Sequence, residues 1–164
     1  MIRSATLKDS QAICDIYNYY ILNSHCTFEY EPITASTIQD RIETVQNASL
    51  EWVVLDVEEK ILGYAYATKW KPRQAYARTV ESTVYLDKDT GGNGYGLKLY
   101  TALIESLRSK KIHAVLGGIA LPNESSIALH EKLGYQKVAQ LKEVGYKFNR
   151  WIDVGYWELI LDDA

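Results

Sequence analysis

Four segments of the chain carry an apolar residue at every third or fourth position, the spacing of one face of an α-helix. The clearest follows a glycine-rich stretch and holds Leu97, Leu99, Tyr100, Leu103, Ile104 and Leu107. Another is followed directly by Gly134, and glycine is a common residue at a helix end. The predicted helices cover about residues 8–22, 34–47, 97–107 and 124–133.

Between these helices the pattern changes to short runs rich in apolar and β-branched residues, which is typical of strands. Residues 52–57 and 61–67 flank a turn at Glu58–Lys60 and predict a hairpin. The other expected strands are residues 2–6, 79–86, 114–120, 135–144 and 151–161. With no internal repeat and no linker, the sequence predicts one α+β domain over residues 1–164, built around a mixed sheet.

Composition changes this picture little. The 18 Lys and Arg against 21 Asp and Glu give a net charge of −3, which provides no basic face for a nucleic acid. No apolar run is long enough for a signal peptide or a membrane span. Cys14 and Cys26 are too few and wrongly spaced for a zinc site. We therefore expect a cytoplasmic protein with two reduced thiols, no metal, no nucleic acid and no membrane contact.

A glycine-rich loop, residues 91–96, lies between an expected strand and the strongest helix. Alternating glycines expose backbone N–H groups, and a helix N-terminus adds positive potential, so the loop predicts an anion site. Lys98 stands between leucines, which does not fit a Walker loop. Leu97 stands where a dinucleotide-binding fingerprint has its third glycine, which argues against a nucleotide-binding oxidoreductase. A flexible turn without a ligand stays an alternative.

The second half of the chain is more specific. It contains TVESTVYL, GNGYGLKLYTALI, GIALPNESSIALHEKLGY and GYKFNRWIDVGYWEL in this order. This series resembles the GNAT acetyltransferases, and within them the phosphinothricin and methionine-sulfone N-acetyltransferases. The stretch from IRSATLKDSQ to HCTFEYEP and the segment GYAYATKWKPRQAY resemble the same subgroup, so the likeness covers essentially the whole chain.

The resemblance implies a GNAT fold, a twisted and mostly antiparallel sheet of about seven strands flanked by about four helices. It also implies acetyl-CoA as a cosubstrate, without a metal. The residues that it assigns to this cofactor are Val84, Tyr85, Leu86, Gly92, Asn93, Gly94, Tyr95, Gly96, Leu97, Asn123 and Ser126. Gly91 stands where the family usually has Gln or Arg, so one phosphate contact is lost and we expect weaker cofactor binding.

Two residues match the catalytic positions of the subgroup. Glu81 lies on an apolar strand, where an isolated carboxylate is costly to bury unless it takes part in catalysis or forms an ion pair. The resemblance assigns Glu81 the role of the base that deprotonates the amine. His130 follows Asn123 by seven residues and would act as acid, base or proton relay. The alternatives are an exposed strand carboxylate and a histidine on a helix surface.

Further candidates concern the acceptor. Arg73 could bind its carboxylate in a bidentate manner, with Tyr76 from the same segment beside it. Phe28 and Tyr85, together with Glu81, would wall the pocket, although a core or interface role fits Phe28 equally well. Trp151 and Trp157 are expected in the core or at a dimer interface.

The sequence thus predicts an enzyme that acetylates the amino group of a small amino acid or analogue, by direct transfer in a ternary complex. Direct transfer is favoured because neither cysteine falls in a catalytic motif of the family. The subgroup implies a homodimer. The alternatives are a GNAT enzyme for a polyamine or a protein N-terminus, and a CoA-binding module without turnover.

Overall fold

Seven strands form one sheet and four α-helices cover its two faces in the computed structural model, which describes residues 1–162. The strands are β1 (Ile2–Ser4), β2 (Trp52–Val57), β3 (Lys60–Lys69), β4 (Thr79–Leu86), β5 (Ala114–Ala120), β6 (Gln136–Lys147) and β7 (Arg150–Ile160). The helices are α1 (Ser10–Asn23), α2 (Ala35–Asn47), α3 (Tyr95–Ser109) and α4 (Glu124–Lys132), with short 3₁₀ helices η1 (Leu7–Asp9) and η2 (Gln74–Tyr76).

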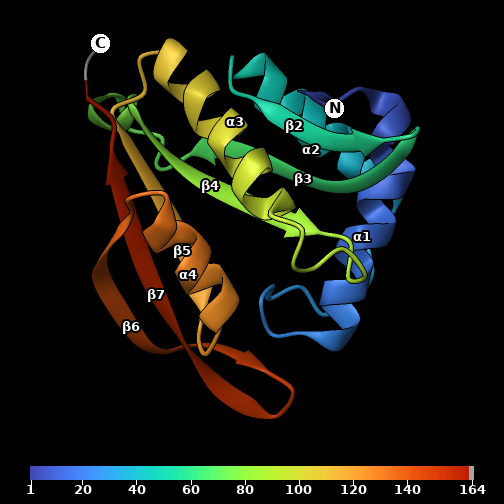
Figure 1. Cartoon of the computed structure of the whole chain (residues 1–164). Coiled ribbons are helices and arrows are strands. Elements are labelled where there is room, and N and C mark those ends of the chain that lie inside the picture. The colour runs from blue at the N-terminus through green and yellow to red at the C-terminus, as the bar shows by residue number, and fades with distance from the viewer. Residues whose placement is uncertain (163–164) are drawn as a thin grey trace.

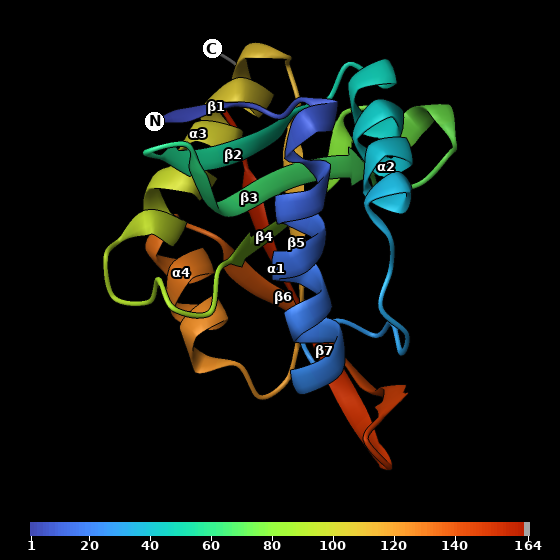
Figure 2. The same ribbon diagram turned by 90° about the vertical axis from the view of Figure 1, so that its right-hand side faces the viewer.

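The strand order is β1-β2-β3-β4-β5-β7-β6, and β4–β5 is the parallel pair in an otherwise antiparallel sheet. Helices α1 and α2 lie on one face and α3 and α4 on the other (Figures 1 and 2). The mixed, mostly antiparallel sheet of seven strands and its four helices confirm the predicted fold class. Within residues 1–162 no helix is long and apolar enough to cross a membrane.

The two faces of the sheet carry different side chains because residues alternate along each strand. On the α1 side, Tyr64 of β3 and Tyr85 of β4 form an aromatic cluster with Tyr17 and Tyr20 of α1. On the other side the small Ala65 and Ala67 are fully buried; small side chains there let α3 lie close to the strands. The sheet centre is thus aromatic on one face and tightly packed on the other.

Strand β6 runs three residues beyond its predicted end, and β7 begins one residue before its predicted start. They form one hairpin whose turn is Phe148–Asn149, and both residues have positive φ, 51° and 57°. A turn with two left-handed residues matches the twist of a hairpin, but without glycine its sequence signal is weak. Trp157 is buried as expected, whereas Trp151 is 62% exposed, so a core position for Trp151 is wrong.

Candidate active site

The site begins where β4 and β5 separate. Their parallel pairing runs from Thr79 and Ala114 to Glu81 and Leu116 and then stops. Beyond this point the two strands line a cavity of about 420 Å³ that reaches from the α1 side of the sheet to α4. Parallel strands that stop pairing leave backbone N–H and C=O groups without a ladder partner, so the opening supplies both room and hydrogen-bonding groups.

One edge of the cavity is the backbone of β4. At the two ends of the β3–β4 ladder, Thr79 accepts from Trp70 and the N–H of Asp87 donates to Leu62. The odd-numbered residues of β4 therefore direct their backbone groups toward β3, and the N–H and C=O of Val84 point toward the cavity. The C=O of Leu86, on the same side, accepts from the Tyr20 hydroxyl at 2.6 Å.

The glycine loop leads into α3 beside this edge. Gly94 is the N-cap residue of the helix, with φ +69°, and Gly92 has φ +83°. These left-handed conformations require glycine, and a Cβ at Gly91, Gly92 or Gly94 would meet no atom within 4 Å. The first N–H groups of α3 have no acceptor within the helix, so the loop and helix end form an anion cradle.

Helix α4 closes the cavity with its first turn. The Oδ1 atom of Asn123 caps this helix by accepting from the Ser126 N–H at 3.2 Å. Of the residues assigned to the cofactor, those that line the cavity are Val84, Tyr85, Leu86, Gly96, Asn123 and Ser126. Gly92, Asn93, Gly94, Tyr95 and Leu97 belong to the adjoining loop and the start of α3 instead.

His130 is buried at the end of the cavity near α3, rather than on the helix surface. Its Nδ1 lies 2.7 Å from the Ser126 C=O, so Nδ1 carries a proton and donates it there. The Tyr100 hydroxyl then donates to the remaining ring nitrogen, Nε2, at 3.1 Å. Burial lowers the pKa of His130. The imidazole is therefore neutral near pH 7.

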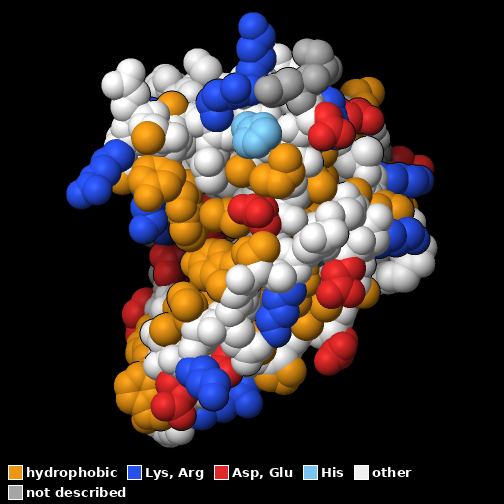
Figure 3. Space-filling model, turned by 90° about the vertical axis from the view of Figure 1, so that its left-hand side faces the viewer, with side chains coloured by type: hydrophobic (Ala, Val, Ile, Leu, Met, Phe, Trp, Pro, Cys, Tyr) orange, Lys and Arg blue, Asp and Glu red, His pale blue; other side chains and the backbone are white. Residues whose placement is uncertain are grey.

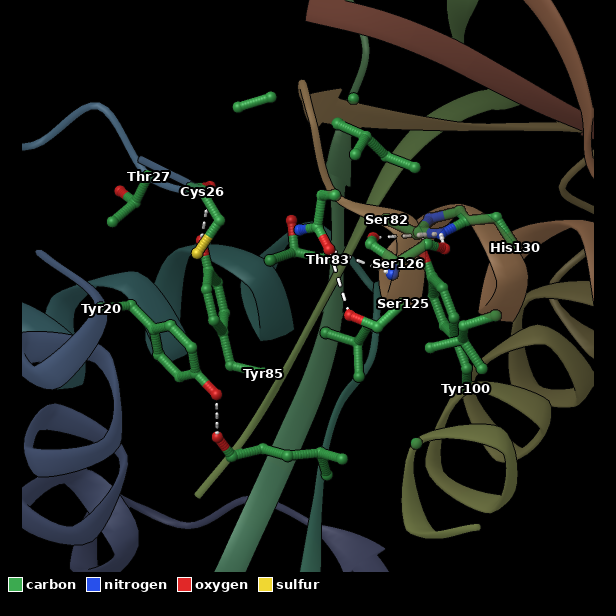
Figure 4. A pocket seen from close by; sticks show the side chains of 18 of the residues that line it. Tyr20, Cys26, Thr27, Ser82, Thr83, Tyr85, Tyr100, Ser125, Ser126 and His130 are labelled. Atoms are coloured by element: carbon green, nitrogen blue, oxygen red, sulfur yellow. Dashed lines mark hydrogen bonds between the residues drawn. The ribbon is translucent and has the colours of Figure 1, made fainter. Parts of the chain in front are cut away.

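Two further hydroxyl groups extend this contact. The Ser82 side chain lies between the hydroxyls of Tyr100 and Tyr135 and forms a hydrogen bond with each; Figure 4 shows Ser82 and Tyr100 beside His130. All three residues are buried. Sequence reasoning missed this group because Tyr100 follows the apolar period of its helix and looks like an ordinary core residue.

Glu81 lies on the opposite face of the sheet from His130. A Cβ at Gly117 would overlap the His130 ring, whereas one at the next residue, Gly118, would lie 3.1 Å from the Glu81 Oε1 atom. Consecutive strand residues point to opposite faces, so the cavity joins the two groups through the opening. Burial raises the pKa of Glu81, and no cationic side chain of residues 1–162 forms an ion pair with it.

The end of the cavity near Glu81 is built from distant segments. Its walls are Tyr66 of β3, Tyr85 of β4, and Cys26 and Thr27 from residues 24–30, which we call the wall segment. Figure 4 shows Cys26, Thr27, Tyr20 and Tyr85 on the side of the cavity across from His130. Sequence reasoning singled out Phe28 but not its neighbours Cys26 and Thr27, because nothing in the spacing indicates which side chain of a loop turns inward.

The other predicted acceptor residues do not line this cavity. Arg73 and Tyr76 lie at η2 and are exposed, and the Phe28 ring packs against Gly145 of β6. Their roles at the acceptor stay predictions. Within residues 1–162 no group of His, Cys, Asp and Glu side chains is arranged to hold a metal ion.

The match to a family model agrees with this geometry. Residues 2–155 match the acetyltransferase (GNAT) domain. The chain belongs to the GNAT acetyltransferase family. This acetyltransferase is 43% identical to a phosphinothricin N-acetyltransferase of Streptomyces viridochromogenes, over 96% of this chain and 85% of the relative.

Two further relatives support the same grouping. A Pseudomonas aeruginosa L-methionine sulfoximine/L-methionine sulfone acetyltransferase is 34% identical over 98% of this chain and 94% of its own. A Salmonella typhimurium acetyltransferase, solved with its cofactor acetyl-CoA, superimposes with a TM-score of 0.96 at 32% identity, covering 100% of this chain and 95% of that one. The predicted family and enzyme class are confirmed.

Proposed function

We propose that this acetyltransferase transfers the acetyl group of acetyl-CoA to the amino group of a small amino acid or analogue of the phosphinothricin or methionine-sulfone type. The observation that carries the proposal is Glu81, a half-buried carboxylate without an ion-pair partner among residues 1–162, at the opening between β4 and β5. The named relatives support the acceptor class.

Acetyl-CoA fits the half of the cavity made of backbone. In our proposal the pantetheine arm pairs with the free N–H and C=O of Val84, and Tyr85 and Leu86 extend this edge. The pyrophosphate binds residues 92–97, whose N–H groups and helix N-terminus favour an anion. Asn123 and Ser126 contact the arm from α4. This arrangement brings the thioester to the opening in the sheet.

Glu81 then acts as the general base. An amino group is mostly ammonium at pH 7, and it attacks the thioester carbon only after losing a proton. A carboxyl whose pKa is raised by burial is a better match to that proton transfer than an exposed one. His130, in contact with the Tyr100 hydroxyl on the opposite face, acts as a proton relay: its neutral ring takes up at Nε2 a proton released by the attacking amine and passes it to the departing thiolate.

Direct transfer is favoured over a covalent intermediate. Cys14 is buried in α1 and bonded to the Ile33 C=O. Cys26 does line the cavity, but burial raises the pKa of its thiol, and the thiolate is the nucleophile. A Cys14→Ser, Cys26→Ser double variant should keep intersecting initial-velocity lines. Parallel lines in the wild type would contradict direct transfer.

One observation favours a second acceptor class. Among the residues that line the cavity, Glu81 carries the only formal charge near pH 7, because Arg73 lies elsewhere. A polyamine without a carboxylate is therefore compatible with the cavity itself. Thiol release from acetyl-CoA, measured across amino acids, their sulfones and sulfoximines, polyamines and peptides, distinguishes the two classes. Turnover with polyamines alone would overturn the amino-acid proposal.

We also propose that the enzyme works as a homodimer in the cytoplasm, detoxifying or conferring resistance to such compounds. The support for association is a set of exposed apolar side chains on the β6–β7 hairpin. They are Val138, Leu141, Val144, Tyr146, Phe148, Trp151 and Ile160. Hydrophobic side chains also gather along one side of the face in Figure 3. Light scattering on the wild type and on Trp151→Lys tests this, and a wild-type monomer would overturn it.

A further inference from the structure

The wall segment supplies Cys26 and Thr27 to the acceptor end of the cavity, yet it is neither helix nor strand. A loop of this kind has no regular hydrogen-bond ladder, so other groups must fix its path. On the cavity side, the Tyr17 hydroxyl bonds to Thr27 Oγ1 at 2.6 Å and the Tyr85 hydroxyl donates to the Cys26 C=O at 3.3 Å.

On its other side the wall segment is held by one buried lysine. Lys147, the last residue of β6, is 3% exposed. Its ammonium donates to the Ser24 C=O at 2.9 Å and to the Thr27 C=O at 2.8 Å. These two carbonyls bracket Cys26, so a single side chain from a distant strand closes the turn that directs Cys26 toward the cavity.

Among residues 1–162, no ion pair neutralises the charge of this ammonium. No carboxylate of residues 1–162 forms a salt bridge with Lys147, while Glu29 of the wall segment is already paired with Arg41. Burial lowers the pKa of Lys147, and a buried ammonium is costly unless its hydrogen bonds compensate. The charge reaches the cavity wall, since it lowers the pKa of the Cys26 thiol against the effect of burial.

The same hairpin contacts the wall segment twice more. The Phe28 ring covers Gly145, where a Cβ would overlap it, and the Tyr30 hydroxyl donates to the Tyr146 C=O. Residues 145–147 thus form the support for the wall segment. Residues 145–147 hold one side of the wall segment, while α1 and β4 hold its opposite side.

We propose that Lys147 is a positioning and specificity residue: it holds Cys26 and Thr27 in the acceptor wall, and its charge favours acceptors that carry a carboxylate. This inference rests on the proposed amine acetylation, since it concerns the acceptor end. The cavity has no cation in its own lining. Lys147 places a positive charge directly behind the cavity wall.

The first test does not depend on activity. Alkylation of Cys26 by iodoacetamide is followed by mass spectrometry as a function of pH in the wild type, Lys147→Met, Lys147→Arg and the exposed control Lys142→Met. Lys147→Met should raise the thiol pKa, because a positive charge is lost. It should also raise the limiting rate of the thiolate by about tenfold, the scale of one lost charge-assisted hydrogen bond. Lys147→Arg should keep the thiol pKa, and Lys142→Met should match the wild type.

The second test separates binding from chemistry. Lys147→Met should raise the KM for an amino-acid acceptor by about tenfold, and less for the amine lacking the carboxylate, with kcat and the Kd of CoA nearly unchanged. Equal KM changes for both acceptors would overturn the role of the charge. Unchanged alkylation kinetics would overturn the role in positioning.

Two other results can be distinguished from these outcomes: a Lys147→Met variant that does not fold, and a proposed function that is wrong. If Lys147→Met does not fold, Gly145→Ala displaces Phe28 from the same support without changing charge. That variant should raise the thiolate alkylation rate and leave the thiol pKa unchanged; an unchanged rate would overturn the inference. If the wild type acetylates no amine, the proposed function fails, while the alkylation experiment still decides whether Lys147 holds the wall.

Discussion

The two halves of the cavity are built in different ways. The half that we propose binds the cofactor comprises β4 from Val84 to Leu86, the loop before α3 and the first turn of α4, and it offers mostly backbone groups and helix ends. The half that we propose binds the acceptor consists of side chains brought together from residues 26–27, 66, 81 and 85. A backbone site depends on chain path and tolerates many side chains, whereas a side-chain site changes with every substitution. Acceptor specificity can therefore change while acetyl-CoA binding stays the same.

The largest effect is expected at Glu81, in the acceptor half. Glu81→Gln keeps the shape but removes the base, so kcat at pH 7 should fall by about 10²–10⁴-fold, the usual value of general acid–base catalysis. The loss should shrink at high pH, where solution supplies the neutral amine. Steady-state kinetics from pH 6 to 10 and calorimetry with CoA measure the two halves separately, and CoA affinity should barely change.

The matched control for this variant is Glu158→Gln on β7, a carboxylate outside the cavity, which should retain full activity. Turnover of Glu81→Gln near the wild-type rate at pH 7 would show that the base is elsewhere. His130 or a water chain would then be the next candidate.

How much could be predicted follows this same division. The glycine loop and the strand before it are consecutive in sequence, so local patterns located them, whereas Asn123 was assigned only through the resemblance to the family. Ser82, Tyr100 and Tyr135 meet only through the tertiary fold, and each looks like a core residue. The same holds for Cys26 and Thr27, whose orientation depends on Lys147, more than a hundred residues away. The order and type of the elements were predicted because their periods are strong, while the β6–β7 turn lacked glycine.

The next effect is expected in the cofactor half, at Gly94. Its φ of +69° is one that a β-branched residue adopts only with strain. Gly94→Val should weaken CoA binding by about 10–100-fold, the range of 1–3 kcal/mol of backbone strain. Calorimetry with CoA in the presence of EDTA measures it, and also tests binding without metal. Gly91→Val is the control, because no positive φ is found there and a Cβ has open space. Equal losses in both variants would contradict an explanation by backbone conformation.

A smaller effect concerns pH and His130, at the cofactor end. Burial lowers its pKa in the folded state, so on acidification the unfolded chain binds this proton first. The free energy of unfolding should therefore fall as pH drops below the ordinary histidine range, near 6.5. His130→Gln removes this contribution. Between pH 8 and pH 5 the Tm of this variant should therefore fall less than the Tm of the wild type does, by a few degrees. The exposed control His113→Gln should follow the wild type; a His130→Gln profile parallel to the wild type would show that His130 titrates normally.

The smallest effect is a gain at Gly91. This position lacks the side chain that the family usually places there, and the structure gives no steric reason for its absence: φ is not positive and no atom lies within 4 Å of an added Cβ. An arginine at this exposed position would add one phosphate contact, and an exposed ionic contact is worth up to about 1 kcal/mol. Gly91→Arg should thus tighten CoA binding by up to about fivefold, and salt should reduce the gain. Gly91→Met, of similar length without charge, should give no gain. Because the change touches only the cofactor half, the acceptor KM at saturating acetyl-CoA should stay constant, and a shift in that KM would show that the two halves are coupled.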